Sequence, residues 1–304
     1  MLPTTYHPDC IEYHRSLGAF WAGMYELQDA EEDEHRKGGV LGFKISDDGS
    51  ELERLWEVQT DYGVLDLRSR GGHFLAACSD GQVKLLNSEN ADCLSSLQCT
   101  QFEGYKGVVM GIDGSNSTWA SITTGGELSI LSVESEIGLR QEIRIQAHDK
   151  AFESWAVAMS PDHRYVLTGS DDCSMRIWSL DGERIAINTR THTYGVTAFT
   201  FIDEHLFYSG SYDENVRLWD IRNPATPVST TKVRGGVWRI KLGPMNERLI
   251  AACYGGAEIW DESMTERLAS FDKHESMVYG ISSTDGGRVV SCSFYDNKIC
   301  LWDR

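Results

Sequence analysis

A histidine, an aspartate and a nearby serine or threonine recur together in the second half of the chain. The histidines are His148, His192 and His274, and the matching aspartates are Asp172, Asp213 and Asp296. A serine, a histidine and an aspartate also make up a hydrolase triad, in which the histidine takes the serine proton. A catalytic triad should occur once, whereas this set repeats. The recurrence therefore predicts buried structural hydrogen-bond networks, with His148 and His192 kept as alternative general bases.

A second group of residues with chemical potential is aromatic. Its members are Trp155, Tyr194, Tyr212, Trp238, Tyr254 and Tyr295. An aromatic-walled site can hold a cation against its ring faces, with a contribution of about 1–2 kcal/mol when the contact is desolvated. Exposed aromatic residues also bind loops of partner proteins, and both interpretations stay open at this stage.

The motifs of common cofactor and metal sites do not occur in the sequence. It contains no G-x-S-x-G nucleophile turn, no H-E-x-x-H zinc motif and no histidine–cysteine cluster at zinc spacing. A Walker loop and a dinucleotide fingerprint are also missing. We therefore expect neither a cofactor nor a metal, and motifs alone favour a non-catalytic interaction platform.

The elements that must position these residues repeat about every 42 residues. Four strand endings carry a tryptophan in the runs MRIWS, VRLWD, EIWD and CLWD, namely Trp178, Trp219, Trp260 and Trp302. The steps between them are 41, 41 and 42 residues. This period and ending are typical of the WD40 repeat, one four-stranded blade of a β-propeller. Resemblance to that repeat implies a buried chain of His192, Asp213, Ser209 or Ser211, and Trp219.

The first half of the chain keeps the period and loses the tryptophan. Phe43, Leu86 and Leu131 stand at the corresponding strand endings, and the steps from 43 to 178 are 43, 45 and 47 residues. Seven endings predict an all-β, seven-bladed WD40 propeller that forms a single domain over residues 1–304. Because the last repeat stops after its third strand, residues 2–7 are expected to supply the outer strand of the final blade.

Charge and hydropathy narrow the classes of partner. The formal net charge of −18 argues against direct nucleic-acid binding, which requires Lys and Arg to neutralise phosphates. It suits a basic protein partner, and solubility alone explains it equally well. The acidic run from Asp29 to Glu34 is interpreted as a solvated loop or as a docking loop for such a partner. No run approaches the ~20 apolar residues of a membrane helix, so no membrane association is expected.

The eight cysteines are scattered without C-x-x-C spacing. Cys78, Cys253 and Cys292 fall at matching places in expected second strands, and we interpret them as small buried core residues. The N-terminal run MLPTTYHPDC has neither the basic nor the apolar region of a secretory signal. These features predict a reduced, cytoplasmic protein.

Some segments contain residues that a generic repeat does not require. The most distinctive are QAHDKAFESW (146–155), RTHTYGV (190–196), GSYDEN (210–215), GGVWRIK (235–241) and CSFYD (292–296). DCIEY (9–13) and GMYEL (23–27) add to them in the first repeat. Together these segments closely resemble the diphthine methylesterase family, the WD40 proteins of diphthamide biosynthesis. The resemblance spans the chain and is strongest from residue 146 onward.

The resemblance implies an activity and a substrate. Enzymes of this family hydrolyse the methyl ester of methylated diphthine on the modified histidine of elongation factor 2, and methanol leaves. It therefore implies elongation factor 2 as the protein substrate of a chain that we expect to be monomeric. The competing hypothesis is a non-catalytic WD40 scaffold in trafficking or in substrate recruitment to a ubiquitin ligase.

Residues before inner strands and after second strands share one face of a propeller, so the aromatic group is expected around the mouth of its central channel. Methylated diphthine carries a trimethylammonium group that such a mouth can hold. Ester hydrolysis also needs a base and an oxyanion donor. Arg239 is the candidate donor, and Glu153 or Glu214 the candidate base. Strand alternation predicts that Trp238 and Arg239 point to opposite faces, so that at most one reaches the channel.

Overall fold

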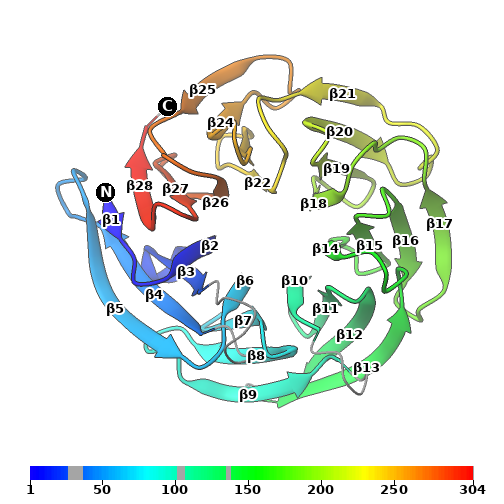
Figure 1. Ribbon diagram of the computed structural model, residues 1–304, viewed down its shortest axis with the longest axis horizontal. Coiled ribbons are helices and arrows are strands. Elements are labelled where there is room, and N and C mark those ends of the chain that lie inside the picture. The colour runs from blue at the N-terminus through cyan, green and yellow to red at the C-terminus, as the bar shows by residue number, and fades with distance from the viewer. Residues whose placement is uncertain (27–36, 101–106, 135–137, 304) are drawn as a thin grey trace.

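Seven four-stranded antiparallel sheets surround a common centre in the computed structural model (Figure 1), which describes residues 1–26, 37–100, 107–134 and 138–303. The predicted seven-bladed fold is confirmed. The acidic run from Asp29 to Glu34 lies outside the described residues. A 3₁₀ turn, η1 (Arg15–Leu17), joins the first two strands of the first blade. No helix in the described ranges is long and apolar enough to cross a membrane.

Each blade runs from the centre outward in chain order, except that the last blade takes its outer strand from the N-terminus. The inner strands are β2 (His7–His14), β6 (Val64–Arg70), β10 (Val109–Ser115), β14 (Ser154–Met159), β18 (Val196–Phe201), β22 (Arg239–Leu242) and β26 (Val278–Ser283). The second strands are β3 (Ala19–Tyr25), β7 (His73–Cys78), β11 (Thr118–Thr123), β15 (Tyr165–Ser170), β19 (Leu206–Ser211), β23 (Arg248–Ala251) and β27 (Val289–Ser293).

The two outer layers complete each blade. The third strands are β4 (Gly38–Ile45), β8 (Gln82–Asn87), β12 (Glu127–Glu134), β16 (Met175–Ser179), β20 (Asn215–Asp220), β24 (Ala257–Trp260) and β28 (Lys298–Trp302). The outer strands are β5 (Leu52–Thr60), β9 (Cys93–Gln98), β13 (Gly138–Gln146), β17 (Arg184–Asn188), β21 (Ser229–Lys232), β25 (Arg267–Phe271) and β1 (Leu2–Pro3).

The residues that replace tryptophan upstream occupy the same structural position. Phe43, Leu86 and Leu131 are buried at the ends of third strands. In each of these blades the register between third and outer strand shifts immediately before that residue, as it does before Trp178 and Trp260. A large apolar side chain at this place fills the space between blades, so the period persists although the tryptophan does not.

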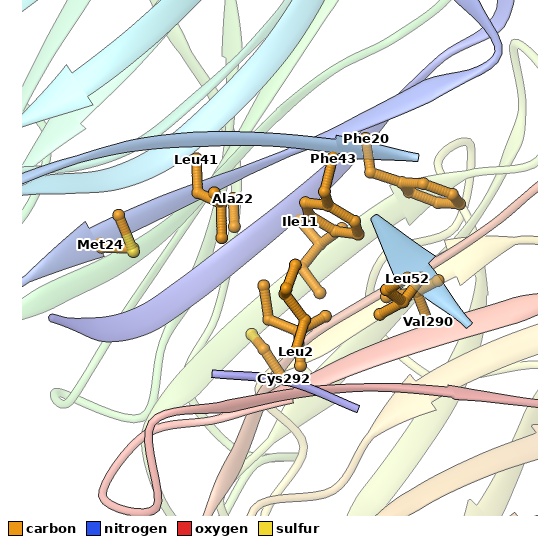
Figure 2. Close-up of a cluster of buried hydrophobic side chains, with 11 residues drawn as sticks. Leu2, Ile11, Phe20, Ala22, Met24, Leu41, Phe43, Leu52, Val290 and Cys292 are labelled. Carbon is orange, nitrogen blue, oxygen red and sulfur yellow. The ribbon is translucent and has the colours of Figure 1, made fainter. Parts of the chain in front are cut away.

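The N-terminal strand joins the first and last blades. In β1, Leu2 pairs with Ile299 of β28, and the Thr4 N–H donates to the carbonyl of Asn297 at 3.0 Å. Figure 2 shows Leu2 packed beside Cys292, within a buried cluster drawn from both blades. The strand is shorter than the expected residues 2–7, because His7 already pairs with Tyr25 inside β2 and β3.

The three cysteines expected in the core are buried. Cys78 and Cys292 end or nearly end second strands, and Cys253 follows one, each with 0% exposure. Burial raises the pKa of the Cys253 thiol to about 12, so this thiol stays protonated at neutral pH. A structural role therefore accounts for all three.

Candidate functional site at the mouth of the central channel

In the fourth, fifth and last blades, the histidines belong to structural hydrogen-bond networks. In the fourth blade, His148 Nε2 lies 2.8 Å from Thr168 Oγ1, and the Trp178 indole donates to the same oxygen at 2.9 Å. Asp172 accepts from Arg176 at 2.7 Å and lies 3.1 Å from His148 Nδ1. Burial alone would raise the pKa of Asp172, but hydrogen bonds from His148 and Ser174 outweigh it and lower the pKa to about 2.

The fifth blade keeps the same hydrogen-bond network, with one difference from the predicted series of hydrogen bonds. His192 Nε2 lies 2.9 Å from Ser209 Oγ, which also accepts from the Trp219 indole at 2.8 Å, so Ser209 rather than Ser211 is the linking hydroxyl. No hydrogen bond joins Asp213 to His192 in the described part of the structure. Asp213 instead accepts two hydrogen bonds from Arg217, at 3.0 and 2.8 Å. The expected His192–Asp213 link is therefore replaced by an Arg217–Asp213 pair.

The last blade repeats the pattern with the residues expected of it. His274 Nε2 lies 2.8 Å from Ser291 Oγ, the Trp302 indole donates to that oxygen at 3.0 Å, and His274 Nδ1 lies 3.7 Å from Asp296. Burial lowers the pKa of all three histidines, and for His192 burial and the nearby Arg217 charge lower it to about 4. Each imidazole is neutral at pH 7 and already held by its blade, which disfavours His148 and His192 as catalytic bases.

A pocket of about 470 Å³ opens between the fourth, fifth, sixth and seventh blades. Its aromatic walls are Trp155, Tyr194, Tyr212, Trp238 and Tyr279. Its remaining lining comes from Asp171, Cys173, Gly195 and Thr197. The Trp155 and Trp238 rings lie 5.5 Å apart, and Trp238 lies 4.7 Å from Tyr279, as centroid distances. Four of the six aromatic residues selected from the sequence thus line one pocket, which we call the aromatic pocket.

The other two selected aromatics lie outside that lining. Tyr254 is 72% exposed, and its hydroxyl is 3.5 Å from that of Tyr212, so it extends the aromatic surface beyond the pocket. Tyr295 is 56% exposed and packs edge-on against Phe294, 4.9 Å away. Both belong to the same end of the ring as the loops that follow second strands.

Both Trp238 and Arg239 reach the centre, which corrects the expectation of opposite faces. Five of the inner strands carry a register shift after their first residue, for example between Ser154 and Ala156. In the sixth blade Ala251 pairs with Arg239, and its carbonyl also accepts the Trp238 N–H at 2.8 Å. Two residues opposite one is the count of a β-bulge, which re-aims a side chain and breaks strict alternation.

A charged cluster lies below the aromatic pocket in the central channel. A small cavity lined by Trp155, Thr197 and Arg239, among others, connects the two levels, because Trp155 and Thr197 also line the aromatic pocket. Arg239 Nη2 lies 3.6 Å from Asp66 and 3.7 Å from Asp9, and both carboxylates are almost fully buried.

The cluster continues through further pairs. Arg68 Nη1 lies 2.7 Å from Asp66, its Nε lies 3.4 Å from Asp113, and Lys241 Nζ lies 2.6 Å from Glu12. Opposite charges at these distances hold Arg239 as a fixed cation in the channel rather than as a mobile surface residue. Such a guanidinium can stabilise a developing oxyanion.

The two glutamates selected as bases occupy different places. Glu214 lies in the turn between β19 and β20 with a left-handed φ of 64°, and its carboxylate is 3.4 Å from Lys232 of the outer strand. It does not line the aromatic pocket. Glu153 is exposed just before β14, and its carbonyl accepts the Asp171 N–H at 2.8 Å, which places its backbone at the pocket rim.

Several residues at the site were not selected from the sequence. Asp171, Tyr279 and Thr197 line the aromatic pocket, and Asp9 and Asp66 hold Arg239. Asp9 stands in the distinctive segment DCIEY, which was a usable signal. Asp171 directly precedes Asp172. Because the WD40 repeat accounts for an aspartate after the second strand, the sequence offered no separate reason to select Asp171. Among the described residues no group of three or more His, Cys, Asp or Glu is arranged to hold a metal ion.

Comparison with known proteins supports the same family as the sequence segments. The model described as "WD domain, G-beta repeat" matches residues 140–179, 184–220 and 265–303. The WD40 β-propeller domain of Doa1 superposes with a TM-score of 0.77 at 16% identity, covering 100% of this chain and 95% of that one. At that identity the likeness establishes the fold alone.

Several curated relatives share one name. The "Diphthine methyltransferase homolog" of Dictyostelium discoideum is 25% identical and covers 98% of this chain and 96% of its own length. The human "Diphthine methyltransferase" is 30% identical over 83% of this chain, which spans only 63% of the human protein. The Schizosaccharomyces pombe protein of that name is 24% identical, with 92% and 89% coverage. The chain is therefore similar, over most of its length, to WD-repeat proteins that carry the name diphthine methyltransferase.

Proposed function

We propose that this protein hydrolyses the methyl ester of methylated diphthine on elongation factor 2, releasing methanol. The observation that carries the proposal is the aromatic pocket, which adjoins a channel cavity containing Arg239. The names of the relatives place those proteins in methyl chemistry on diphthine. Because that modification is carried by a translation factor, the proposed reaction belongs to the cytoplasm.

The chemistry of the substrate fits this pair of sites. Methylated diphthine carries its trimethylammonium group and its ester carbonyl on the same carbon atom. A cation held against the Trp155 and Trp238 rings, within the pocket that they line, therefore brings the ester to the level of Thr197 and the channel cavity. Arg239, fixed by Asp9 and Asp66, is the proposed donor to the oxyanion that forms when water attacks the carbonyl carbon.

The reaction also requires a group that takes a proton from the attacking water. We propose Glu153, whose backbone stands at the rim of the aromatic pocket and whose side chain is exposed. The tetrahedral intermediate then expels methoxide, which leaves as methanol after protonation. A correctly placed general base contributes roughly 10²–10⁴-fold to the rate.

A non-catalytic scaffold is the second candidate, and one observation favours it. Tyr194 and Tyr254 are 63% and 72% exposed at the end of the ring that bears the pocket, and Phe152, in the loop before β14, is 46% exposed. Exposed aromatic residues of this kind also anchor partner proteins. The scaffold would bind at this face without needing Arg239 in the channel.

Mass spectrometry of elongation factor 2 from cells lacking this protein tests the proposal. A hydrolase predicts accumulation of a species one methyl group heavier than diphthine. Accumulation of a species that lacks methyl groups would instead show that the protein adds them. Normal diphthamide would sink both enzymatic functions and leave the scaffold.

The purified protein gives a second test of the same step. Wild-type protein should release methanol from methylated elongation factor 2. Glu153→Gln should lower kcat by about 10²-fold or more with little change in KM, if Glu153 is the base. An unchanged kcat in Glu153→Gln would remove Glu153 from the mechanism while leaving the ester hydrolysis itself standing.

A further inference from the structure

The aromatic pocket contains one feature that its aromatic walls do not explain. Asp171 lines it together with Trp155. Burial raises the pKa of Asp171, and the nearby Trp155 indole partly offsets that rise. A Cβ built on Gly195 would lie only 2.1 Å from Asp171 Oδ1, so the carboxylate packs directly on the Gly195 backbone. Asp171 is an exposed residue whose carboxylate lines the mouth of the pocket against Gly195.

The repeat itself does not require an acid at this position. In five blades, the residue that follows the second strand donates its N–H to the carbonyl of a residue just before the inner strand. These five residues are Ser79, Thr124, Asp171, Tyr212 and Phe294. Asp171 alone among them carries a charge, and the structural aspartate of its blade is the next residue, Asp172. The WD40 network thus gives no account of Asp171.

A carboxylate set among aromatic rings has a clear ligand chemistry. Ring faces attract a cation without donating or accepting hydrogen bonds, so they suit a quaternary ammonium, which has no N–H to donate. A carboxylate in the same wall adds attraction that an uncharged ligand of equal shape does not feel. The pocket volume of about 470 Å³ lies within the usual range for small-molecule sites.

We propose that Asp171 is the residue that makes the aromatic pocket selective for a quaternary ammonium over an uncharged group of the same shape. The proposal deepens, and rests on, the proposed function, since it assigns the trimethylammonium of the substrate to this pocket. It separates two roles at the site: Asp171 selects the cation, and Arg239 and Glu153 act on the ester.

Two small probes of the same shape test the selectivity without any catalysis. Choline carries a trimethylammonium group, and 3,3-dimethylbutan-1-ol replaces its nitrogen with carbon. Trp155 and Trp238 line the pocket, so tryptophan fluorescence reports binding in the full-length protein. We expect wild-type protein to bind choline about tenfold or more tightly than the alcohol.

Asp171→Asn keeps the shape of the side chain while it removes the charge. We expect the preference of this variant for choline to fall severalfold, to the smaller preference that the rings alone supply. Asp171→Ser provides a second variant, smaller and equally uncharged, with the same expectation. Glu275→Gln is the matched control: it removes one exposed carboxylate, paired with Lys298, that does not line the pocket. The control should keep the wild-type preference for choline.

The outcomes distinguish failure of this inference from failure of the proposed function. Equal binding of both probes by wild-type protein, or a preserved choline preference in Asp171→Asn, would overturn the inference. So would a variant that loses kcat for ester hydrolysis with unchanged choline affinity, because Asp171 would then act on the ester. Selective choline binding without any ester hydrolysis would support the inference and remove the hydrolase function.

Discussion

Buried ion pairs between single residues contribute to the stability of the blades. Arg217 and Asp213 are paired with only 7% and 3% of their side chains exposed. Removing one partner strands the other charge away from water, whereas removing a partner of an exposed pair does not. Breaking one of these ion pairs therefore costs most stability where the repeat buries both side chains.

The first prediction follows from this pair. Asp213→Ala should lower the free energy of unfolding by about 2–4 kcal/mol, because Arg217 and the Thr193 N–H lose their acceptor. Asp220→Ala is the matched control, since its partner Arg222 is largely exposed and stays solvated without it, and it should cost under about 1 kcal/mol. Urea denaturation measures both. If Asp213→Ala were as stable as wild type but inactive, Asp213 would belong to the catalytic site.

The second prediction concerns pH. Burial lowers the pKa of His192 to about 4, below the ordinary value of about 6.5 that it regains on unfolding. Between these values the unfolded chain binds more protons than the folded one, so stability falls as pH falls from about 6.5 to about 4. His148 and His274 shift in the same direction. Urea denaturation at pH 7.5, 6 and 5 should show a progressive loss, of about 2 kcal/mol by pH 5 from His192 alone.

This pH effect has an internal control. His192→Gln should be less stable than wild type at pH 7.5, yet its stability should depend less on pH in that window. A stability that stays level or rises between pH 6.5 and 5 in wild-type protein would contradict the buried, neutral state of these histidines.

At the scale of strands, the sequence predicts which segments pair but not where side chains aim. The 41- and 42-residue period located β16, β20, β24 and β28, and apolar residues at matching places located the upstream third strands. A bulge near the start of an inner strand changes the directions of the side chains that follow it, so simple alternation gave the wrong directions for Trp238 and Arg239. For the same reason Tyr279, one residue into β26, escaped selection.

The sixth blade shows how one element can replace the usual network. It lacks the histidine, and Glu258, with 0% exposure, accepts from the Trp260 indole at 2.8 Å and from Arg234 at 2.6 Å. Arg267 adds a third donor at 3.2 Å. In this blade a buried carboxylate that accepts from three donors replaces both the histidine and the serine of the usual network. The sequence ending EIWD did not predict this replacement.

The third prediction tests this substitution. Glu258→Ala should lower the free energy of unfolding by about 3 kcal/mol, because it leaves the buried indole N–H and Arg234 without their shared acceptor. Asp272→Ala removes the other, exposed carboxylate that contacts Arg234 and should cost under about 1 kcal/mol. Equal stability of the two variants in urea would show that Glu258 is not the centre of this blade.

For the whole molecule, the net charge of −18 and the closed ring have separate consequences. Charge of this size repels nucleic acid and favours association with basic surfaces, and salt should weaken that association. Ring closure depends instead on short-range packing between the first and last blades. The net charge follows directly from composition. The place of the last tryptophan predicted where the ring had to close.

The fourth prediction concerns that closure. Leu2 is buried against Ile11, Val290 and Ile299, so Leu2→Ala should cost about 2–3 kcal/mol and lower the melting temperature by several degrees. Leu55→Ala, on the exposed face of an outer strand, should change it little.

Deleting residues 1–3 should lower the melting temperature further, because it also exposes the free edge of β28 and removes the Pro3 carbonyl that accepts from Arg54 at 2.8 Å. The deletion stops before His7 because β2 begins there, so the first blade stays intact. Differential scanning calorimetry measures all three proteins. A deletion variant that melts like wild type would mean that the ring is held by the contacts of β2 with β26 and β27, and that the N-terminal strand only covers an edge.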